Sequence, residues 1–376
     1  MTSLAVILLV VFFLYYCWFV LRVRIGLDAA APVNFENGRT SFVSVVVAAR
    51  NEEKNIQRCI RSLVNQTFSK NDFEVIVVDD NSSDKTREVV ADLARSDSRI
   101  RLLQLPTSKE NEVGRKPQAI ALGIQNAKGE VIATTDADCV VPQAWLENML
   151  KRLTQDTAFI AGPVLEKDGP SLLSKLESLE FMSLIVTGAG LIGFGHPIIC
   201  NGANLMYRKS AFQDVKGFDN AESSCDDETL MQRIALKKSG KIKFCLEAGA
   251  IVETASQNNI RSFWSQRVRW AAKKGRYGNP VILIELVALY LFFLVFLLSA
   301  ITALFVPALA LPVAIIFGLK ALVDFVTLSR GANMLQQRLA FNSFFLAELL
   351  HAPYIVVAAA QAQFAAIQWK GRTLTR

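Results

Sequence analysis

The chain has 376 residues, 52% of them hydrophobic, and a formal net charge of +7. This is enough chain for roughly two or three domains. The positive charge does not indicate nucleic-acid binding, because most of it gathers beside an apolar run and no basic groove with interleaved aromatic residues occurs elsewhere. Residues 28–274 have the composition of a soluble domain, and the parts on either side are apolar. We therefore expect a globular body with membrane segments at both ends.

The first apolar run, Leu4–Leu21, carries no charge and is near the lower limit of length for a membrane span. No positive charge precedes it, whereas Arg22 and Arg24 follow it. A cleaved signal peptide has the opposite asymmetry, although residues 28–32 contain small residues suited to cleavage. We therefore expect residues 1–24 to be a retained anchor in the cytoplasmic (inner) membrane, with the next domain in the cytoplasm.

Residues 42–135 alternate between β-branched runs and segments with helical spacing of apolar residues. Strands are expected at 42–48, 73–78, 100–105 and 130–135, and helices at 52–65, 84–95 and 116–127. Strands that alternate with helices of this length predict an α/β fold with a mostly parallel, doubly wound sheet.

Two of the expected strands end in paired carboxylates. Asp79 and Asp80 end the second strand, and Asp136 and Asp138 follow the fourth. Ligands of such sheets bind outside the carboxyl ends of the strands, and hard divalent cations bind carboxylates together with substrate phosphates. The pattern predicts a metal–nucleotide site. The alternative is that Asp80 and Asp138 only cap the helices that follow.

Phe181–Cys200 lacks Asp, Glu, Lys and Arg over twenty residues, but it contains four glycines and a proline. A membrane span here would place the acids around Asp136 and Asp226 on opposite sides of the membrane. We therefore expect that it does not span. It forms either an apolar wall for a lipid-like or growing acceptor, or a buried core helix with a loop.

An amphipathic helix is expected within 258–278, ahead of the C-terminal apolar runs. Gln266, Arg269, Trp270 and Lys273 fall on one helical stripe. Such a helix would lie along the membrane surface. Its polar stripe either closes the active site or serves as a plain interfacial anchor.

About three more membrane segments are expected within 280–369. Pro280–Val306 is interrupted by one acid, and the later runs are interrupted by polar residues at four positions: Lys320, Asp324, Glu348 and His351. Three spans would place the basic tail outside, against the positive-inside rule. Either one interrupted segment is re-entrant or interfacial, or the tail is an exception.

Five motifs occur in an order that resembles the family 2 inverting glycosyltransferases. They are VSVVVAARNEE (43–53), VIVVDDNSSDKT (75–86), RKPQAIALGIQNAKGEVIATTDADC (115–139), CDDETL (225–230) and QRVRW (266–270). The similar subgroup is membrane-embedded and includes cellulose, chitin and hyaluronan synthases and ceramide glucosyltransferases. The resemblance covers about residues 40–275 and the flanking helices. It implies a GT-A type nucleotide-diphospho-sugar transferase domain at 40–257.

The resemblance also implies how the donor is held. Asp80 would accept a hydrogen bond from the uracil imide, as an acceptor-only carboxylate can, and Glu52 would lie near the nucleoside. Arg50 stands where the family usually has a base-stacking tyrosine. Lys116, with Arg115 beside it, would face the diphosphate. The remaining donor contacts implied are Asp136, Gln266 and Arg269.

Metal, base and acceptor residues are implied in the same way. Asp138 would ligate Mg²⁺ or Mn²⁺ at the diphosphate, and Asp136 would contact ribose or metal. Asp227 would be the general base that deprotonates the acceptor hydroxyl, although Asp226–Glu228 alone could be only the charged first turn of a helix. Acceptor contacts are implied for Asn201, Gly202, Asp226 and Trp270.

The expected protein is a membrane-bound, metal-dependent inverting glycosyltransferase that moves a sugar from a UDP-sugar to a lipid-linked or saccharide acceptor. The alternatives are a processive polysaccharide synthase, a nucleotidyltransferase and an inactive membrane scaffold. A nucleotidyltransferase would carry a glycine-rich loop where residues 48–52 stand. Six cysteines without C-x-x-C spacing suggest neither zinc nor disulfides. The only histidines are His196, expected to be structural, and His351, expected to lack catalytic partners.

Overall fold

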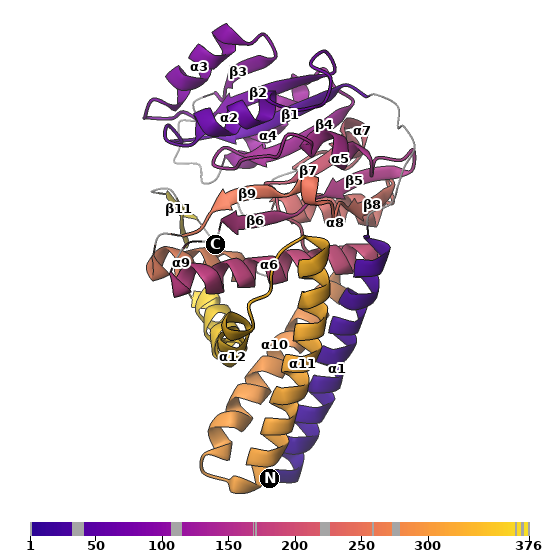
Figure 1. Cartoon of the computed structure of the whole chain (residues 1–376), viewed down its shortest axis with the longest axis vertical. Helices are drawn as coiled ribbons and strands as arrows, with labels where there is room; N and C mark the ends of the chain where they lie inside the picture. Colours follow the sequence, from indigo (N-terminus) through magenta and orange to yellow (C-terminus); the bar gives the residue numbers. More distant parts are fainter. Residues whose placement is uncertain are drawn as a thin grey trace.

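The computed structural model describes residues 2–31, 41–106, 115–167, 169, 171–218, 226–257, 259–272, 279–364, 367–369 and 372–374. Figure 1 shows an α/β domain at one end of the molecule and a bundle of long helices at the other. This arrangement agrees with the globular body and membrane ends expected from composition.

The α/β domain is built on a seven-stranded sheet with the order β3-β2-β1-β4-β7-β5-β8. Neighbours are parallel except around β7, which is antiparallel to both β4 and β5. The expected mostly parallel α/β sheet is thereby confirmed. The strands are β1 Val43–Ala49, β2 Phe73–Asp79, β3 Ile100–Gln104, β4 Val131–Asp136, β5 Thr157–Ala161, β7 Leu205–Arg208 and β8 Lys241–Phe244.

Helices pack on the sheet and bury its central strands, which is why β1 and β2 are almost continuously apolar. A Cβ atom on Gly123 of α4 would lie 2.3 Å from Val46 Cγ1 of β1, so glycine permits the close approach of this helix. The helices of the domain are α2 Ile56–Val64, α3 Thr86–Ser96, α4 Lys116–Gln125, α5 Trp145–Leu150, α7 Lys209–Asp214 and α8 Asp226–Lys237, with a 3₁₀ turn, η1, at Ala248–Ala250.

A second layer lies between the main sheet and the bundle (Figure 1). It consists of the parallel pair β6 (Val164–Lys167) and β9 (Val252–Ala255), followed by α6 (Leu172–Gly193) and α9 (Ile260–Ala271). The α6 helix begins where Ser171 accepts a hydrogen bond from the backbone of Ser174 at 3.0 Å, as N-cap serines do.

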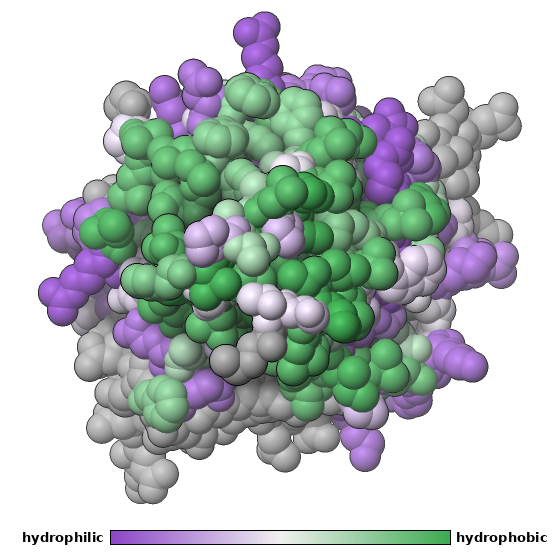
Figure 2. Space-filling view, turned by 90° about the horizontal axis from the view of Figure 1, so that it is seen from below, coloured by the Kyte–Doolittle hydropathy of each residue, from purple (hydrophilic) through white to green (hydrophobic). Residues whose placement is uncertain are grey.

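Four long apolar helices make up the rest of the described chain: α1 Thr2–Ala29, α10 Pro280–Ala303, α11 Ala310–Met334 and α12 Phe341–Phe364. A short 3₁₀ turn, η2 (Pro307–Leu309), precedes α11. Each of the four is long and apolar enough to cross a membrane. Many of their large apolar side chains are exposed, including Leu14 and Ile284. Figure 2, viewed from below, shows these apolar side chains gathered over one face. Such a face suits contact with lipid.

The last apolar run ends earlier than expected. The helix stops at Phe364, and Ile367–Trp369 instead forms strand β10, which pairs with β11 at Arg372–Leu374. Lys370 and Arg376, on which the topology conflict depends, lie outside the described residues.

The α6 helix also passes the length and composition test for a membrane span. It nevertheless runs across the end of the bundle beneath β6 and β9 (Figure 1), and more than half of its most apolar stretch is buried in the protein. It touches α1 very closely, because a Cβ on Gly26 would lie 1.7 Å from the carbonyl oxygen of Gly190. Small residues of this kind let helix backbones meet. This placement agrees with the expectation that the segment does not span.

Candidate active site

The carboxyl ends of β1, β2 and β4 lie side by side, because Ala49 is paired with Asp79 and Ala48 with Asp136. The loops after β1 and β2 are joined by hydrogen bonds: Glu52 N donates to Thr86 Oγ1 at 2.7 Å and Ser83 N to Asn51 Oδ1 at 2.9 Å. These loops occupy positions at which the sequence pattern predicts the first turns of helices. Their hydrogen bonds keep the two strand ends together as one surface.

Asp80 lies at this surface and is only 3% exposed. Arg50 Nη1 donates to the Asp80 backbone oxygen at 2.8 Å and lies 3.4 Å from Oδ2. Arg115 Nη1 lies 3.5 Å from Asp80 Oδ1. Arg115 donates to the Pro106 carbonyl at 2.5 Å and, unlike Lys116, is not among the residues that line the cavity described below.

The end of β4 brings the second acidic pair to the same place. Asp136 Oδ1 accepts a 2.5 Å hydrogen bond from Lys116 Nζ, at the start of α4. Asp138 follows in the turn after the strand, where Arg58 Nη2 donates to its backbone oxygen at 3.3 Å. Burial raises the pKa of the nearby Cys59 thiol, and the negative charges of Asp138 and Asp136 raise it further. Cys59 is therefore kept as a thiol next to this acidic pair.

The described part of the chain shows that this acidic pair fits a divalent cation. The pair supplies hard oxygen ligands from one turn, beside a lysine that can pair with a phosphate. Mg²⁺ and Mn²⁺ are usually held by one or two carboxylates plus substrate phosphates. The five described cysteines are free thiols, four of them buried.

Asp227 approaches the same surface from the first turn of α8. A Cβ atom placed on Gly202 would lie 2.9 Å from Asp227 Oδ2, so the two residues are in direct contact. The Gly202 carbonyl accepts a hydrogen bond from Thr134 Oγ1 of β4 at 3.3 Å. Thr134 thereby fixes the segment Asn201–Gly202 against the strand that carries Asp136. Asp226 begins the helix, and its side chain lies outside what the structure describes.

The α9 helix closes the site from the other side, through a residue that the sequence pattern does not single out. Arg267 is 2% exposed and its Nε donates to Glu180 Oε2 at 3.0 Å. Its guanidinium lies 4.5 Å from the ring centres of both Phe263 and Trp270. Tyr354 of α12 donates to the other oxygen of Glu180 at 2.9 Å. Arg267 thus joins α9 to α6 and, through Glu180, to α12.

Some neighbouring residues of α9 line the cavity, and others pack on residues outside it. Arg269 and Trp270 line the cavity described below. Gln266 does not, and its Oε1 accepts a hydrogen bond from Arg267. Phe263 and Trp264 pack on Tyr354 of α12. The helix is therefore held against other helices on its apolar side. Lys273 lies outside the described residues.

A cavity of about 700 Å³ connects these groups. The predicted donor and metal residues Arg50, Glu52, Asp80, Lys116, Asp136 and Asp138 line it at the strand ends. Asn201, Gly202, Asp227, Arg269 and Trp270 line it as well. Apolar residues of α1, α6, α10 and α12 line the part next to the long helices, its apolar end. The structure thus brings together every predicted site residue except Gln266 and Asp226. Phe181, Ile185 and Gly188 of α6 line the cavity, while much of the same helix is buried in the protein. The helix therefore has features of both expected alternatives, a cavity wall and a core helix.

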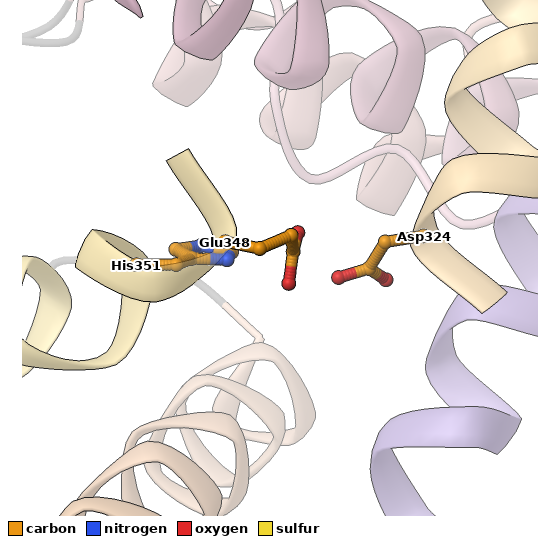
Figure 3. Close-up of side chains that lie close together, drawn as sticks. All are labelled: Asp324, Glu348 and His351. Carbon is orange, nitrogen blue, oxygen red and sulfur yellow. The ribbon is translucent and has the colours of Figure 1, made fainter. Parts of the chain in front are cut away.

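A separate cluster of charges lies within the helix bundle (Figure 3). Lys320 Nζ of α11 lies 2.7 Å from Asp324 Oδ2, 2.6 Å from Glu348 Oε2 and 3.2 Å from His351 Nδ1. Tyr16 of α1 donates to Asp324 at 2.7 Å. The carboxylate and imidazole ligand atoms lie within 4.8 Å of one another, as a metal site requires. The ammonium of Lys320 already supplies a cation among them, so the cluster fits a charge-compensated contact between helices.

This cluster was not foreseen from the sequence, in which its members only interrupt two apolar runs. His351 is not among the residues that line the cavity, and its ring lies beside Lys320 in this contact between helices. The signal was available: ionisable residues inside membrane segments are costly unless they are paired. His196 is structural as expected, lying 2.8 Å from Glu285 Oε2, while Arg22 lies 2.7 Å from Glu285 Oε1.

A parallel sheet with acidic strand ends, an antiparallel β7 and a cavity that reaches a helix bundle define a GT-A type α/β domain flanked by helices. The family model for glycosyl transferase family 2 matches residues 44–216, and that for glycosyl transferase family group 2 matches residues 131–332. The chain belongs to glycosyl transferase family 2.

Two curated relatives illustrate the range of this family. The chain is 30% identical over 256 residues to the beta-monoglucosyldiacylglycerol synthase of Trichormus variabilis, a match that covers 66% of this chain and 52% of that protein. It is 24% identical to the poly-beta-1,6-N-acetyl-D-glucosamine synthase of Staphylococcus aureus, a match that covers 68% of this chain and 60% of that protein. The chain thus spans about half the length of the first relative.

Among solved structures, the mannosyltransferase PcManGT from Pyrobaculum calidifontis, in complex with GDP-Man and Mn²⁺, superposes with a TM-score of 0.62. The superposition covers 96% of this chain and 98% of that one, at 17% sequence identity. At this identity the likeness shows a shared fold, which includes the flanking helices as well as the α/β domain.

Proposed function

We propose that the protein is a membrane-bound inverting glycosyltransferase that moves a sugar from a UDP-sugar to a lipid-linked or saccharide acceptor. The observation that carries the proposal is the shared cavity, in which the acids at the strand ends and Asp227 face the same space from different elements. Family membership supports the reaction class. Relatives named for a glucosyl lipid and for a polysaccharide support both kinds of acceptor.

The donor would lie across the ends of β1, β2 and β4. Asp80, which lies beside Arg50 and Arg115, would accept the imide N–H of uracil. Glu52 would lie beside the nucleoside. Lys116, which pairs with Asp136 in the structure, would pair with the diphosphate when the donor is bound. Arg269 from α9 would approach the diphosphate from the opposite wall of the cavity.

Asp138 and Asp136 would hold Mg²⁺ or Mn²⁺. The metal would supply positive charge against the negative charge that grows on the departing nucleoside diphosphate. The presence of Mn²⁺ in the PcManGT complex supports a divalent cation in this fold. The chain's own contribution is the arrangement of the two carboxylates, since the turn after β4 is held by the bond from Arg58 to the Asp138 backbone.

Asp227 would act as general base. It would take the proton of the acceptor hydroxyl while the hydroxyl oxygen forms a bond to the anomeric carbon. The bond from that carbon to the diphosphate breaks at the same time, and its electron pair leaves with the diphosphate. Asp227 enters the cavity from α8, whereas Asp136 and Lys116, which would contact the diphosphate, come from β4 and α4. Attack by the acceptor hydroxyl from the Asp227 side would therefore invert the configuration of the anomeric carbon.

The α1, α10 and α11 helices, which run side by side away from the α/β domain (Figure 1), would span the cytoplasmic membrane. The α12 helix would be interfacial, because it packs on α6 and α9 and the β10 strand that follows it also packs on α9. Arg22 and Arg24 follow the apolar part of α1, so the α/β domain would face the cytoplasm. The exposed apolar side chains on these helices support this placement.

The test is nucleotide release by the full-length protein in detergent with lipid extract, across UDP-, GDP- and dTDP-sugars with Mn²⁺ or Mg²⁺. Asp138→Asn and Asp227→Asn should each reduce release from the preferred donor by about a hundredfold or more. Asp92→Asn, an exposed carboxylate on α3, is the matched control and should behave as the parent protein. No metal-dependent release from any donor, in folded protein, would favour an inactive membrane scaffold.

A processive polysaccharide synthase remains the second candidate, favoured by the similarity to the poly-beta-1,6-N-acetyl-D-glucosamine synthase. The size of the product distinguishes the two. A ladder of water-soluble oligosaccharides would support processive synthesis, whereas a single labelled lipid would support transfer to a lipid-linked acceptor.

A further inference from the structure

The apolar end of the cavity is built from one face of each of two helices. On α10, Leu286, Leu289, Tyr290 and Phe293 line it, at the spacing i, i+3, i+4 and i+7. On α12 a second face lines it, made up of Tyr354, Ile355, Ala358 and Ala359. Both helices are apolar enough to cross a membrane. The cavity therefore extends from the carboxylates at the strand ends into the part of the protein that meets the lipid.

The faces that α10 and α12 present to the cavity offer little to a saccharide, whereas Glu180, Thr187 and Arg267 line the cavity from α6 and α9. Its lining on α10 and α12 is aliphatic or aromatic, with two tyrosine hydroxyls as the only hydrogen-bonding groups in those two faces. One of these, that of Tyr354, already donates to Glu180. A sugar chain loses its hydrogen bonds to water when buried against such a surface, whereas a hydrocarbon chain loses none.

Small side chains leave room at the same place. Ala358 and Ala359 of α12 line the same cavity as Phe293 and Leu289 of α10. Phe19 of α1 and Gly188 of α6 complete the wall. The apolar part is also continuous with the polar part, since Trp270 and Ile199 line the same space as Gly202 and Asp227.

We propose that the acceptor is a membrane lipid with a free hydroxyl in its head group, and that its hydrocarbon chain lies between α10 and α12. The head group then lies between Trp270 and Asn201–Gly202, with its hydroxyl at Asp227. The chain enters from the bilayer, so the acceptor never leaves the membrane. This inference rests on the proposed glycosyl transfer for the identity of the reacting hydroxyl, but the chain site itself does not depend on catalysis.

Two neighbouring alanines provide a matched pair of variants. Ala359 lines the cavity, whereas Ala360 is exposed on the same helix. Ala359→Trp fills the chain site with an indole ring, and Ala360→Trp places the same ring outside. Both full-length variants are purified in detergent beside the parent protein, and thermal unfolding establishes that they are folded.

Bound lipid is measured by native mass spectrometry after incubation with the total lipid extract of the expression host. Transfer is measured in vesicles of that extract with radiolabelled donor, as label in the organic phase and as nucleotide released. We expect the parent and Ala360→Trp to retain one lipid and to label it. Ala359→Trp should lose the lipid and reduce organic-phase label by about tenfold or more, while its slow donor hydrolysis by water continues.

The outcomes separate the two proposals. Lipid retained by the parent and by Ala360→Trp but lost in Ala359→Trp, with no donor turnover in any of them, would support the chain site and contradict the proposed function. Equal lipid retention and equal labelling in the two variants would overturn the chain site. Label confined to water-soluble saccharide, undiminished in Ala359→Trp, would also overturn it and leave glycosyl transfer standing.

Discussion

Gly202 lies against Asp227 so closely that a Cβ atom on the glycine would be 2.9 Å from Asp227 Oδ2. The glycine belongs to the segment before β7, and the aspartate to the first turn of α8. The absence of a side chain at 202 therefore determines where the proposed base lies relative to β4.

Gly202→Ala should displace Asp227 without unfolding the protein. We expect kcat to fall by about tenfold to a hundredfold, because small misplacements of a catalytic group have effects of this size. The donor KM should change little, since the donor residues lie on other strands. Steady-state nucleotide release measures both. Gly318→Ala on α11, where an added Cβ meets nothing within 4 Å, is the control. Unchanged kcat in Gly202→Ala would argue against Asp227 as the base.

Arg267 positions Trp270, since its guanidinium lies on the indole and its Nε bonds to Glu180. Arg267→Met should lower kcat by about tenfold or more through displacement of the α9 residues that face the cavity. Arg261→Met removes an exposed arginine from the same helix and should leave kcat unchanged. If both variants lose activity equally, the effect is one of net charge and not of position.

Glu166 of β6 gives the protein a predicted dependence of stability on pH. Burial is the largest cause and the charge of Glu177 the next, and together with smaller contributions they raise the pKa of this carboxyl from 4.5 to about 8. Between these values the folded protein holds a proton that the unfolded chain releases, so the free energy of unfolding falls as pH rises and this contribution is gone above about pH 8.

Glu166→Gln removes this titration. The Tm of the variant should match that of the parent near pH 5 and exceed it increasingly up to pH 9, as followed by thermal unfolding in detergent. The control is Glu88→Gln, an exposed carboxyl on α3, which should leave the difference at zero. A constant Tm difference across the pH range would show that Glu166 does not change its ionisation on folding.

Lys320 compensates two carboxylates inside the bundle, at 2.7 Å from Asp324 and 2.6 Å from Glu348. Lys320→Met should destabilise the protein by about 3–5 kcal/mol, because removal of one member leaves buried charge unpaired. Adding Asp324→Asn and Glu348→Gln to that variant should recover much of the loss. Thermal unfolding of the three proteins checks this. Equal stability of Lys320→Met and the parent would mean that the carboxylates are already neutral.

The sheet and much of the site could be predicted because their signals are local. Each strand of β1, β2 and β4 is a short β-branched run, and Asp80 and Asp136 follow those runs directly. The carboxyl ends of parallel strands meet at one edge, so adjacency in space follows from topology. The contacts of Arg267 and of the Lys320 cluster could not be predicted in this way. Their partners Glu180, Glu348 and Tyr16 lie far along the chain, and helical spacing alone does not say which helices touch.

Helix boundaries at the site were also beyond sequence reasoning. Residues 52–55 and 84–85 have helix-like spacing but lie in loops, because bonds such as Glu52 N to Thr86 Oγ1 hold the two loops to each other. A backbone N–H of one loop donates to a side chain of the other loop. The spacing of apolar residues along one segment does not indicate such a contact between segments.

Phe19 of α1 lines the cavity, although it precedes β1 by more than twenty residues. The N-terminal helix, which is long and apolar enough to cross a membrane, is therefore also part of the wall of the transferase cavity. A fragment that begins at β1 would keep the sheet and the carboxylates at the strand ends, but it would lack the part of the cavity wall that α1 supplies. An exchange of α1 for the anchor of another protein would do the same, unless the residues that meet α6 and α10 were exchanged with it. The α/β domain and the long apolar helices therefore form one cavity together, and neither part completes it alone.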